Sequence, residues 1–154
     1  MKPLDDLKNI LLEQEKCCKE LVCLLQEERT RLVDFDVAGM EEISKGKDTL
    51  LLRLRLLEEE RIRLTAAHFT GKEGGPGGEI TLRSLAERTG DTELAGIRLK
   101  LVSLVQSIDD LNGFNRHLID RSLWNVRVAS GFFRSLGGSR SALPGSGSLV
   151  SRET

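Results

Sequence analysis

Tyrosine is absent from the 154-residue sequence, which has only one tryptophan and five phenylalanines. β-Sandwiches and β-barrels depend on aromatic and β-branched residues, so this scarcity argues against both architectures. The only three prolines, at positions 3, 76 and 144, leave long stretches without a helix breaker. Leucine, a strong helix former, dominates the apolar residues. These features predict an all-α protein.

An excess of one charge is also missing, because 23 lysines and arginines face 24 aspartates and glutamates. Nucleic-acid binders and polybasic membrane-surface proteins usually carry a basic domain or stripe, so neither class is expected. No run of about 18 apolar residues is present, and the first residues lack a signal-peptide core. We therefore expect no nucleic-acid partner and no membrane insertion. The C-terminal part is mildly basic, which suits surface solvation or an acidic partner; its arginines are Arg116, Arg121, Arg127, Arg134 and Arg140.

Residues suited to catalysis or metal binding are few. The three cysteines, Cys17, Cys18 and Cys23, are an odd number within one helical stretch, which is a poor disulfide framework. This indicates a reducing compartment and hence a cytoplasmic location. The two histidines, His68 and His117, lie on different predicted helices, whereas a zinc site needs three or four converging ligands. The sequence predicts no enzyme activity, no metal and no cofactor.

Residues 3–35 have the heptad spacing of a coiled-coil helix. Apolar residues recur at alternating steps of three and four, with Gln14 and Glu28 as polar interruptions. We call such positions the seam of a helix. The first seam is Leu4, Leu7, Leu11, Gln14, Cys18, Leu21, Leu25, Glu28, Leu32 and Phe35.

A second helix is expected over residues 38–69, after a tight connection at 36–39. Its strongest apolar part lies between Leu50 and Leu64. A short connection makes two long helices antiparallel neighbours, so we expect a long helical hairpin. The second seam is Met40, Ile43, Lys47, Leu50, Leu54, Leu57, Arg61, Leu64 and His68.

Glycine marks the remaining boundaries. Residues 70–79 have the composition of a linker, and the Gly/Ser-rich residues 137–154 are expected to be a disordered tail. Between them, Thr81 caps a short helix over 81–89 that Gly90 ends, and Asp91 and Thr92 cap a third long helix over 91–135. The expected architecture is a coiled-coil-like three-helix bundle with one short extra helix, forming a helical domain over residues 1–136. The third seam begins Leu94, Ile97, Leu101, Leu104, Ile108, Leu111, Asn115, Leu118 and Ser122, and continues to Phe132.

The last helix changes character past Leu111. Asn115, Ser122 and Asn125 then occupy its seam, and apolar residues appear beside the seam. A helix that is apolar on several faces needs more than one neighbour. Three interpretations are open: this half lies deep in the protein's own core, it pairs in a homodimer, or it receives a partner helix. The apolar residues off the seam are Phe114, Ile119, Leu123, Trp124, Val126, Val128 and Phe133.

Several segments also follow one another in a familiar order. They are Leu-Val-Asp-Phe-Asp at 32–36, Lys47 with Leu-Leu-Leu at 50–52, Leu-Glu-Glu-Glu-Arg at 57–61, Ile-Thr-Leu-Arg-Ser-Leu-Ala at 80–86, Asn-Gly-Phe-Asn at 112–115, Leu-Ile at 118–119 and Ser-Leu at 122–123. In order and spacing, over residues 4 to 133, the chain resembles the FlgN family of flagellar export chaperones.

The resemblance implies a cytoplasmic protein that binds the C-terminal helical segments of hook-associated proteins, which form the hook–filament junction. It implies that the chaperone prevents their premature assembly and delivers them to the flagellar type III export apparatus, using its last helix for binding. The alternative is a coiled-coil adaptor that self-associates through its seams. The predicted partner-binding residues are Leu111, Asn112, Phe114, Asn115, Leu118, Ile119, Ser122, Leu123 and Val126.

Overall fold

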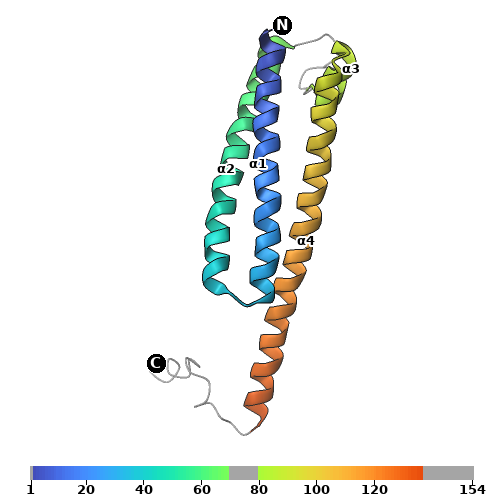
Figure 1. The fold of residues 1–154 in the computed structure, drawn as a ribbon. Coiled ribbons are helices and arrows are strands. Elements are labelled where there is room, and N and C mark those ends of the chain that lie inside the picture. Colours follow the sequence, from blue (N-terminus) through green and yellow to red (C-terminus); the bar gives the residue numbers. More distant parts are fainter. Residues whose placement is uncertain (1, 70–79, 137–154) are drawn as a thin grey trace, which may run out of the picture. The chain divides into compact units, whose positions relative to one another are not determined.

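A computed structural model describes residues 2–69 and 80–136, and these residues are all-α, as expected. The helices are α1 (Lys2–Val33), α2 (Val37–His68), α3 (Leu82–Thr89) and α4 (Thr92–Ser135), shown in Figure 1. The expected linker at 70–79 and tail at 137–154 lie outside the described residues. The chain divides into two compact units, unit 1 (Met1–Asn115) and unit 2 (Arg116–Thr154). Helix α4 contributes to both units.

The connection between α1 and α2 is shorter than expected. Helix α1 ends at Val33 and α2 already begins at Val37, so the prediction of a connection at 36–39 is wrong for its last three residues. The reason is the N-cap: the Asp36 side chain accepts a hydrogen bond from the Gly39 backbone N–H at 3.0 Å. Phe35, expected on the first seam, lies outside α1 with a positive φ of 55° and is 69% exposed.

Helix α1 is packed from two sides in unit 1. It runs antiparallel to α2, and the first half of α4 runs along it in the same direction (Figure 1). Near its start, Leu7 and Leu11 are fully buried with Leu94 of α4 and Leu85 of α3. Near its end, a second apolar cluster packs against α2 and α4. That cluster is Leu21, Leu25 and Leu50, with Leu24, Leu54, Ile108 and Leu111 around it.

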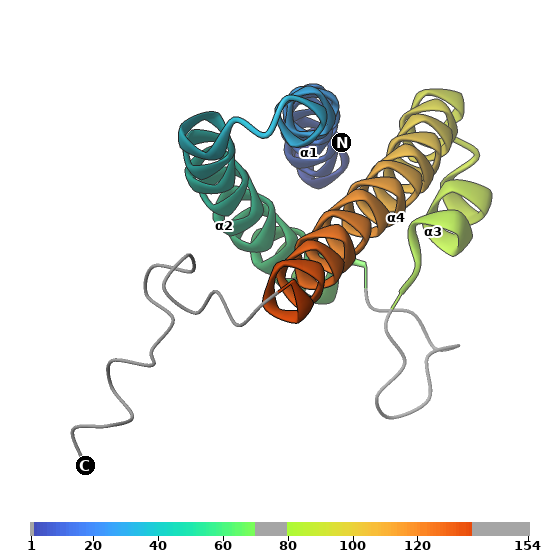
Figure 2. The same ribbon diagram turned by 90° about the horizontal axis from the view of Figure 1, so that it is seen from below.

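The short helix α3 lies beside α4, as Figures 1 and 2 show. Its predicted caps are confirmed: the Thr81 hydroxyl accepts from the Ser84 N–H at 3.1 Å, and Gly90 ends the helix in the left-handed conformation. Of the two residues predicted to cap α4, Asp91 is confirmed, since its carboxylate accepts from the Leu94 N–H at 2.9 Å, whereas Thr92 is the first residue of the helix itself. These caps place Leu85 and Leu94 in the first apolar cluster.

Two polar layers, each with buried and half-buried members, interrupt the apolar seams. In the first, the Gln14 amide donates to the Glu58 carboxylate at 2.9 Å, and Glu58 also pairs with Arg61. The Arg61 hydrogen bonds are the main reason that the pKa of Glu58 lies below its ordinary value. Because a buried polar group is costly unless its partner is opposite it, such a layer favours one register of α1 on α2.

The second polar layer joins all three long helices of unit 1. The Lys47 ammonium lies 2.7 Å from one Glu28 oxygen, and the Asn115 amide donates to the other Glu28 oxygen at 2.9 Å. The same amide donates to the backbone carbonyl of Leu25 at 2.9 Å. The layer holds α4 against α1 at Asn115, which is the last residue of unit 1.

Candidate binding surface on the last helix

The burial of α4 side chains changes at Asn115. Before it, Leu94 and Ile97 are buried in the core of unit 1, and the Asn115 side chain itself is only 1% exposed. Beyond it, in unit 2, no residue of the described helix is buried. Large apolar side chains are nevertheless concentrated there. Those exposed by 40% or more are Ile119, Leu123, Trp124, Val126, Val128, Phe132, Phe133 and Leu136.

The predicted partner-binding residues in unit 1 are largely engaged by the protein itself. Leu111 packs against the second apolar cluster, and Asn115 is held in the second polar layer. Phe114 is 44% exposed, and the Arg29 guanidinium lies 4.5 Å from the centre of its ring. Asn112 is exposed. Phe114 and Asn112 are thus the members of this group that offer surface to a partner.

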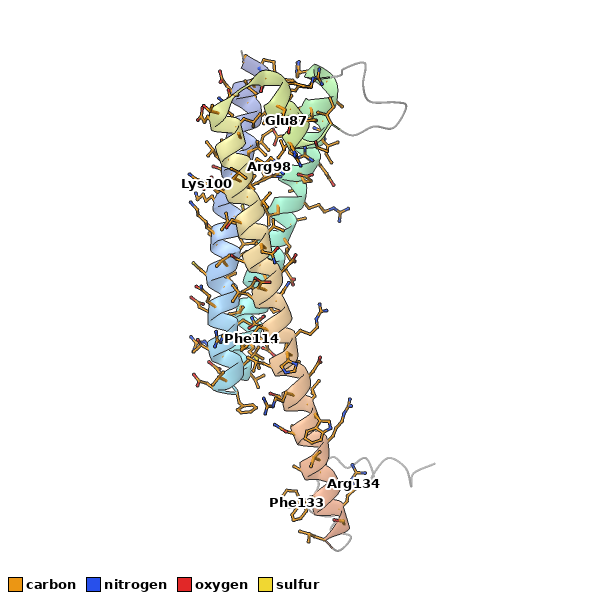
Figure 3. The ribbon with its side chains drawn as sticks, turned by 90° about the vertical axis from the view of Figure 1, so that its right-hand side faces the viewer. Glu87, Arg98, Lys100, Phe114, Phe133 and Arg134 are labelled. Atoms are coloured by element: carbon orange, nitrogen blue, oxygen red, sulfur yellow. The ribbon has the colours of Figure 1, made fainter. Side chains whose placement is uncertain are left out.

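The predicted residues in unit 2 divide into two kinds. Leu118 and Ser122 are half-buried. Ile119, Leu123 and Val126 are 40%, 52% and 60% exposed, respectively, and offer most of the apolar surface. Ile119 and Val126 are seven residues apart and therefore share one face, which continues to Phe133. We call Ile119, Val126 and Phe133 the first stripe. In Figure 3, Phe133 and Arg134 project to opposite sides of α4.

The Asn115 amide is the best-defined polar group of the predicted set. Its nitrogen has two acceptors, at 2.9 Å each, whereas its oxygen is buried and has no hydrogen-bond partner among the described residues. An unpaired buried carbonyl costs about 1–3 kcal/mol, which the two donated hydrogen bonds offset. Asn115 therefore holds α4 against α1 within unit 1.

Sequence reasoning missed an open groove in unit 1. Its volume is about 790 Å³, and it lies over the Gln14, Glu58 and Arg61 layer. In the sequence, only the polar residues Gln14 and Arg61 at seam positions could have indicated this groove. Arg98, on the other side of α4 from Lys100 in Figure 3, has no ion pair among the described residues. The groove is further lined by Ile80, Thr81, Leu82, Arg83, Leu101, Val102, Val105, Gln106 and Asp109.

The described residues contain no cluster of three or more His, Cys, Asp or Glu that would hold a metal ion. Cys17 and Cys18 are buried, and burial raises the pKa of both thiols above its ordinary value, which suppresses the reactive thiolate. Cys23 is exposed. Within the same residues, no helix combines the length and apolar character needed to cross a membrane.

Among known protein families, the family model described as FlgN protein matches residues 1–142, which include helices α1 to α4. No curated protein and no solved structure matches the chain.

Proposed function

The chain belongs to the FlgN family, and from this premise we propose that it is a cytoplasmic, non-enzymatic chaperone for flagellar export. Its clients are hook-associated proteins, whose C-terminal helical segments it binds before assembly. It then delivers them to the flagellar type III export apparatus. The observation that carries the proposal is the exposed apolar surface of α4 beyond Asn115.

The clients are recognised by their apolar helical faces. An unassembled helix exposes such a face, and burying it against Ile119, Leu123 and Val126 removes apolar area from water on both sides. Full burial of one such side chain contributes about 1.5–3 kcal/mol before ordering costs. Because these three side chains are already 40–60% covered, each contributes less than that full amount. A binding free energy built this way is moderate, which suits a chaperone that must release its client.

The residues around this surface have distinct proposed roles. Leu111 and Asn115 hold the base of the binding helix in unit 1. Within unit 1, Phe114 and Asn112 offer further surface to a client, and the Asn112 amide is available to a client backbone. Leu118 and Ser122 border the contact. Asn112 and Ser122 set the register of the client through their polar side chains, as a buried Asn does in a coiled coil.

Calorimetric titration of the full chain with C-terminal peptides of hook-associated proteins tests the proposal. Ile119→Asp and Leu123→Asp place a charge in the interface, and each is expected to weaken binding about 10- to 100-fold. Leu99→Asp is the matched control, because Leu99 is 62% exposed on α4 within unit 1 and lies outside the proposed surface. Unchanged binding by the two variants, with helicity intact, would remove the surface from the proposal.

The second candidate function is a coiled-coil adaptor that self-associates through apolar faces. It is favoured by exposed leucines on α2, namely Leu51, Leu52 and Leu56, which are 50–58% exposed. Sedimentation velocity distinguishes the two functions. A stable oligomer that ignores the client peptides would support the adaptor, whereas a monomer or dimer that binds them supports the chaperone.

A further inference from the structure

Unit 2 has a second apolar stripe that client binding does not use. Trp124, Val128 and Phe132 are spaced by four residues and are 62%, 49% and 59% exposed. At about 100° per residue they lie on a face of α4 turned well away from Ile119 and Val126. We call these three residues the second stripe. Their exposure needs an explanation separate from the client site.

Arginines accompany the second stripe. Arg121 lies in line with it, one turn before Trp124, and Arg127 and Arg134 form a row between the two stripes. Residues 116–135 contain four arginines against a single acidic residue, Asp120. The near-neutral charge of the whole chain therefore conceals a strongly basic segment.

These arginines also differ in their partners from several arginines of unit 1. In unit 1, Arg31, Arg53 and Arg83 each pair with a carboxylate at 3.1 Å or less. No ion pair is formed by Arg121, Arg127 or Arg134 within the part of the chain that the structure describes. The positive charge is thus available to an anionic surface.

We propose that the second stripe and its arginines bind the surface of an anionic phospholipid bilayer. Tryptophan and phenylalanine suit the boundary between headgroups and acyl chains, and arginines beside them reach the lipid phosphates. The helix lies in this boundary and does not cross the bilayer. A second copy of the chain is a poorer occupant, because it brings the same arginines and again only one acidic residue in this segment. The proposal is independent of client binding, which uses Ile119, Leu123 and Val126.

Trp124 provides a direct readout, because it is the only tryptophan and the chain has no tyrosine. The full chain is titrated with vesicles of phosphatidylcholine alone or mixed with phosphatidylglycerol, and Trp124 emission is recorded. A blue shift is expected with the anionic vesicles alone, and it should weaken as salt is raised. No shift with either vesicle, or an equal shift with both, would overturn the proposal. So would a shift that appears without lipid as protein concentration rises, or with an acidic peptide but not with vesicles.

Three variants sharpen the test, each checked for helicity by circular dichroism. Replacing Arg121, Arg127 and Arg134 by Gln is expected to weaken vesicle binding on the order of 100-fold, since each arginine is worth about fivefold near an anionic surface. Val128→Ser with Phe132→Ser, which keeps the reporter, should abolish the shift while client peptides still bind. Leu99→Ser with Val102→Ser, an exposed apolar pair in unit 1, is the control and should leave the shift unchanged. Vesicle binding that survives the first two variants, or is lost in the control, would contradict the assignment.

Discussion

The role of Asn115 in unit 1 is tested most sharply by Asn115→Asp, which changes the amide to a carboxylate of nearly the same shape. The amide nitrogen now donates to Leu25 and Glu28 at 2.9 Å each. A carboxylate at this place has no proton to donate, and it faces the negative charge of Glu28 at a site that is only 1% exposed. Lys47 is the only cation that the structure pairs with Glu28, so one negative charge remains uncompensated.

An uncompensated buried charge costs about 3–5 kcal/mol. Domains of this size are stable by about 5–15 kcal/mol, so Asn115→Asp should remove a large part of the stability at pH 8. The introduced acid titrates at a raised pKa in the folded state and near its ordinary value of about 3.9 in the unfolded state. Its penalty is therefore absent below about pH 4, grows as the pH rises toward the folded pKa, and is complete above it.

Urea unfolding followed by circular dichroism at several pH values measures this effect. Asn115→Leu is the control, because it removes the amide and its unpaired oxygen without adding charge; it should cost about 1–2 kcal/mol at every pH. Equal stability of the Asp variant and the wild type at pH 8 would refute the assigned layer. A pH dependence shared by both variants would refute it equally.

Three further predictions concern the core, a cap and a strained residue of unit 1. Leu94→Ala should lower the free energy of unfolding in urea by about 2–5 kcal/mol, because Leu94 is 0% exposed. Leu99→Ala, at a 62% exposed position, should change it by no more than about 0.5 kcal/mol. Similar losses in the two variants would contradict the placement of Leu94 in the core. The hydrogen bond from Lys8 is the main reason that the pKa of Asp91 is lowered, so the stabilisation by Asp91 is present above its unfolded-state pKa and is lost as the pH falls through its folded-state pKa. Asp91→Asn should therefore flatten the acid side of the curve of unfolding free energy against pH. An unaltered curve would count against the Lys8–Asp91 pair. Phe35→Gly should raise the melting temperature and add about 0.5–1 kcal/mol to the free energy of unfolding, because glycine accepts the φ of 55° without a side-chain clash. A loss of stability would show that the Phe35 ring is needed for packing.

The sequence predicted the elements of the fold because their causes are local. Heptad spacing placed Leu7, Leu11 and Leu94 on the predicted seams, and all three are fully buried in the structure. Thr81 and Gly90 marked the ends of α3 through capping, which involves only nearby backbone groups. These signals lie within a few residues of the structure that they determine.

The polar layers were beyond sequence reasoning because they depend on which helices meet. Gln14 and Glu28 appear in the sequence only as interruptions of a seam, whereas each has a polar partner on another helix in the structure. Asn115 was predicted to bind a partner, but the structure shows its amide bound to Leu25 and Glu28, 87 or more residues earlier in the chain. The apolar residues beyond Asn115 were visible from composition, but their exposure is a property of the folded chain.

Hydrogen exchange across residues 105–133, with and without a saturating C-terminal peptide of a hook-associated protein, tests the central claim most directly. If the exposed half of α4 is the client-binding surface, amides between Arg116 and Phe133 gain protection with the peptide, while those of α4 before Asn115 change little. Identical exchange in the two samples, or protection confined to the hairpin of α1 and α2, would contradict the account.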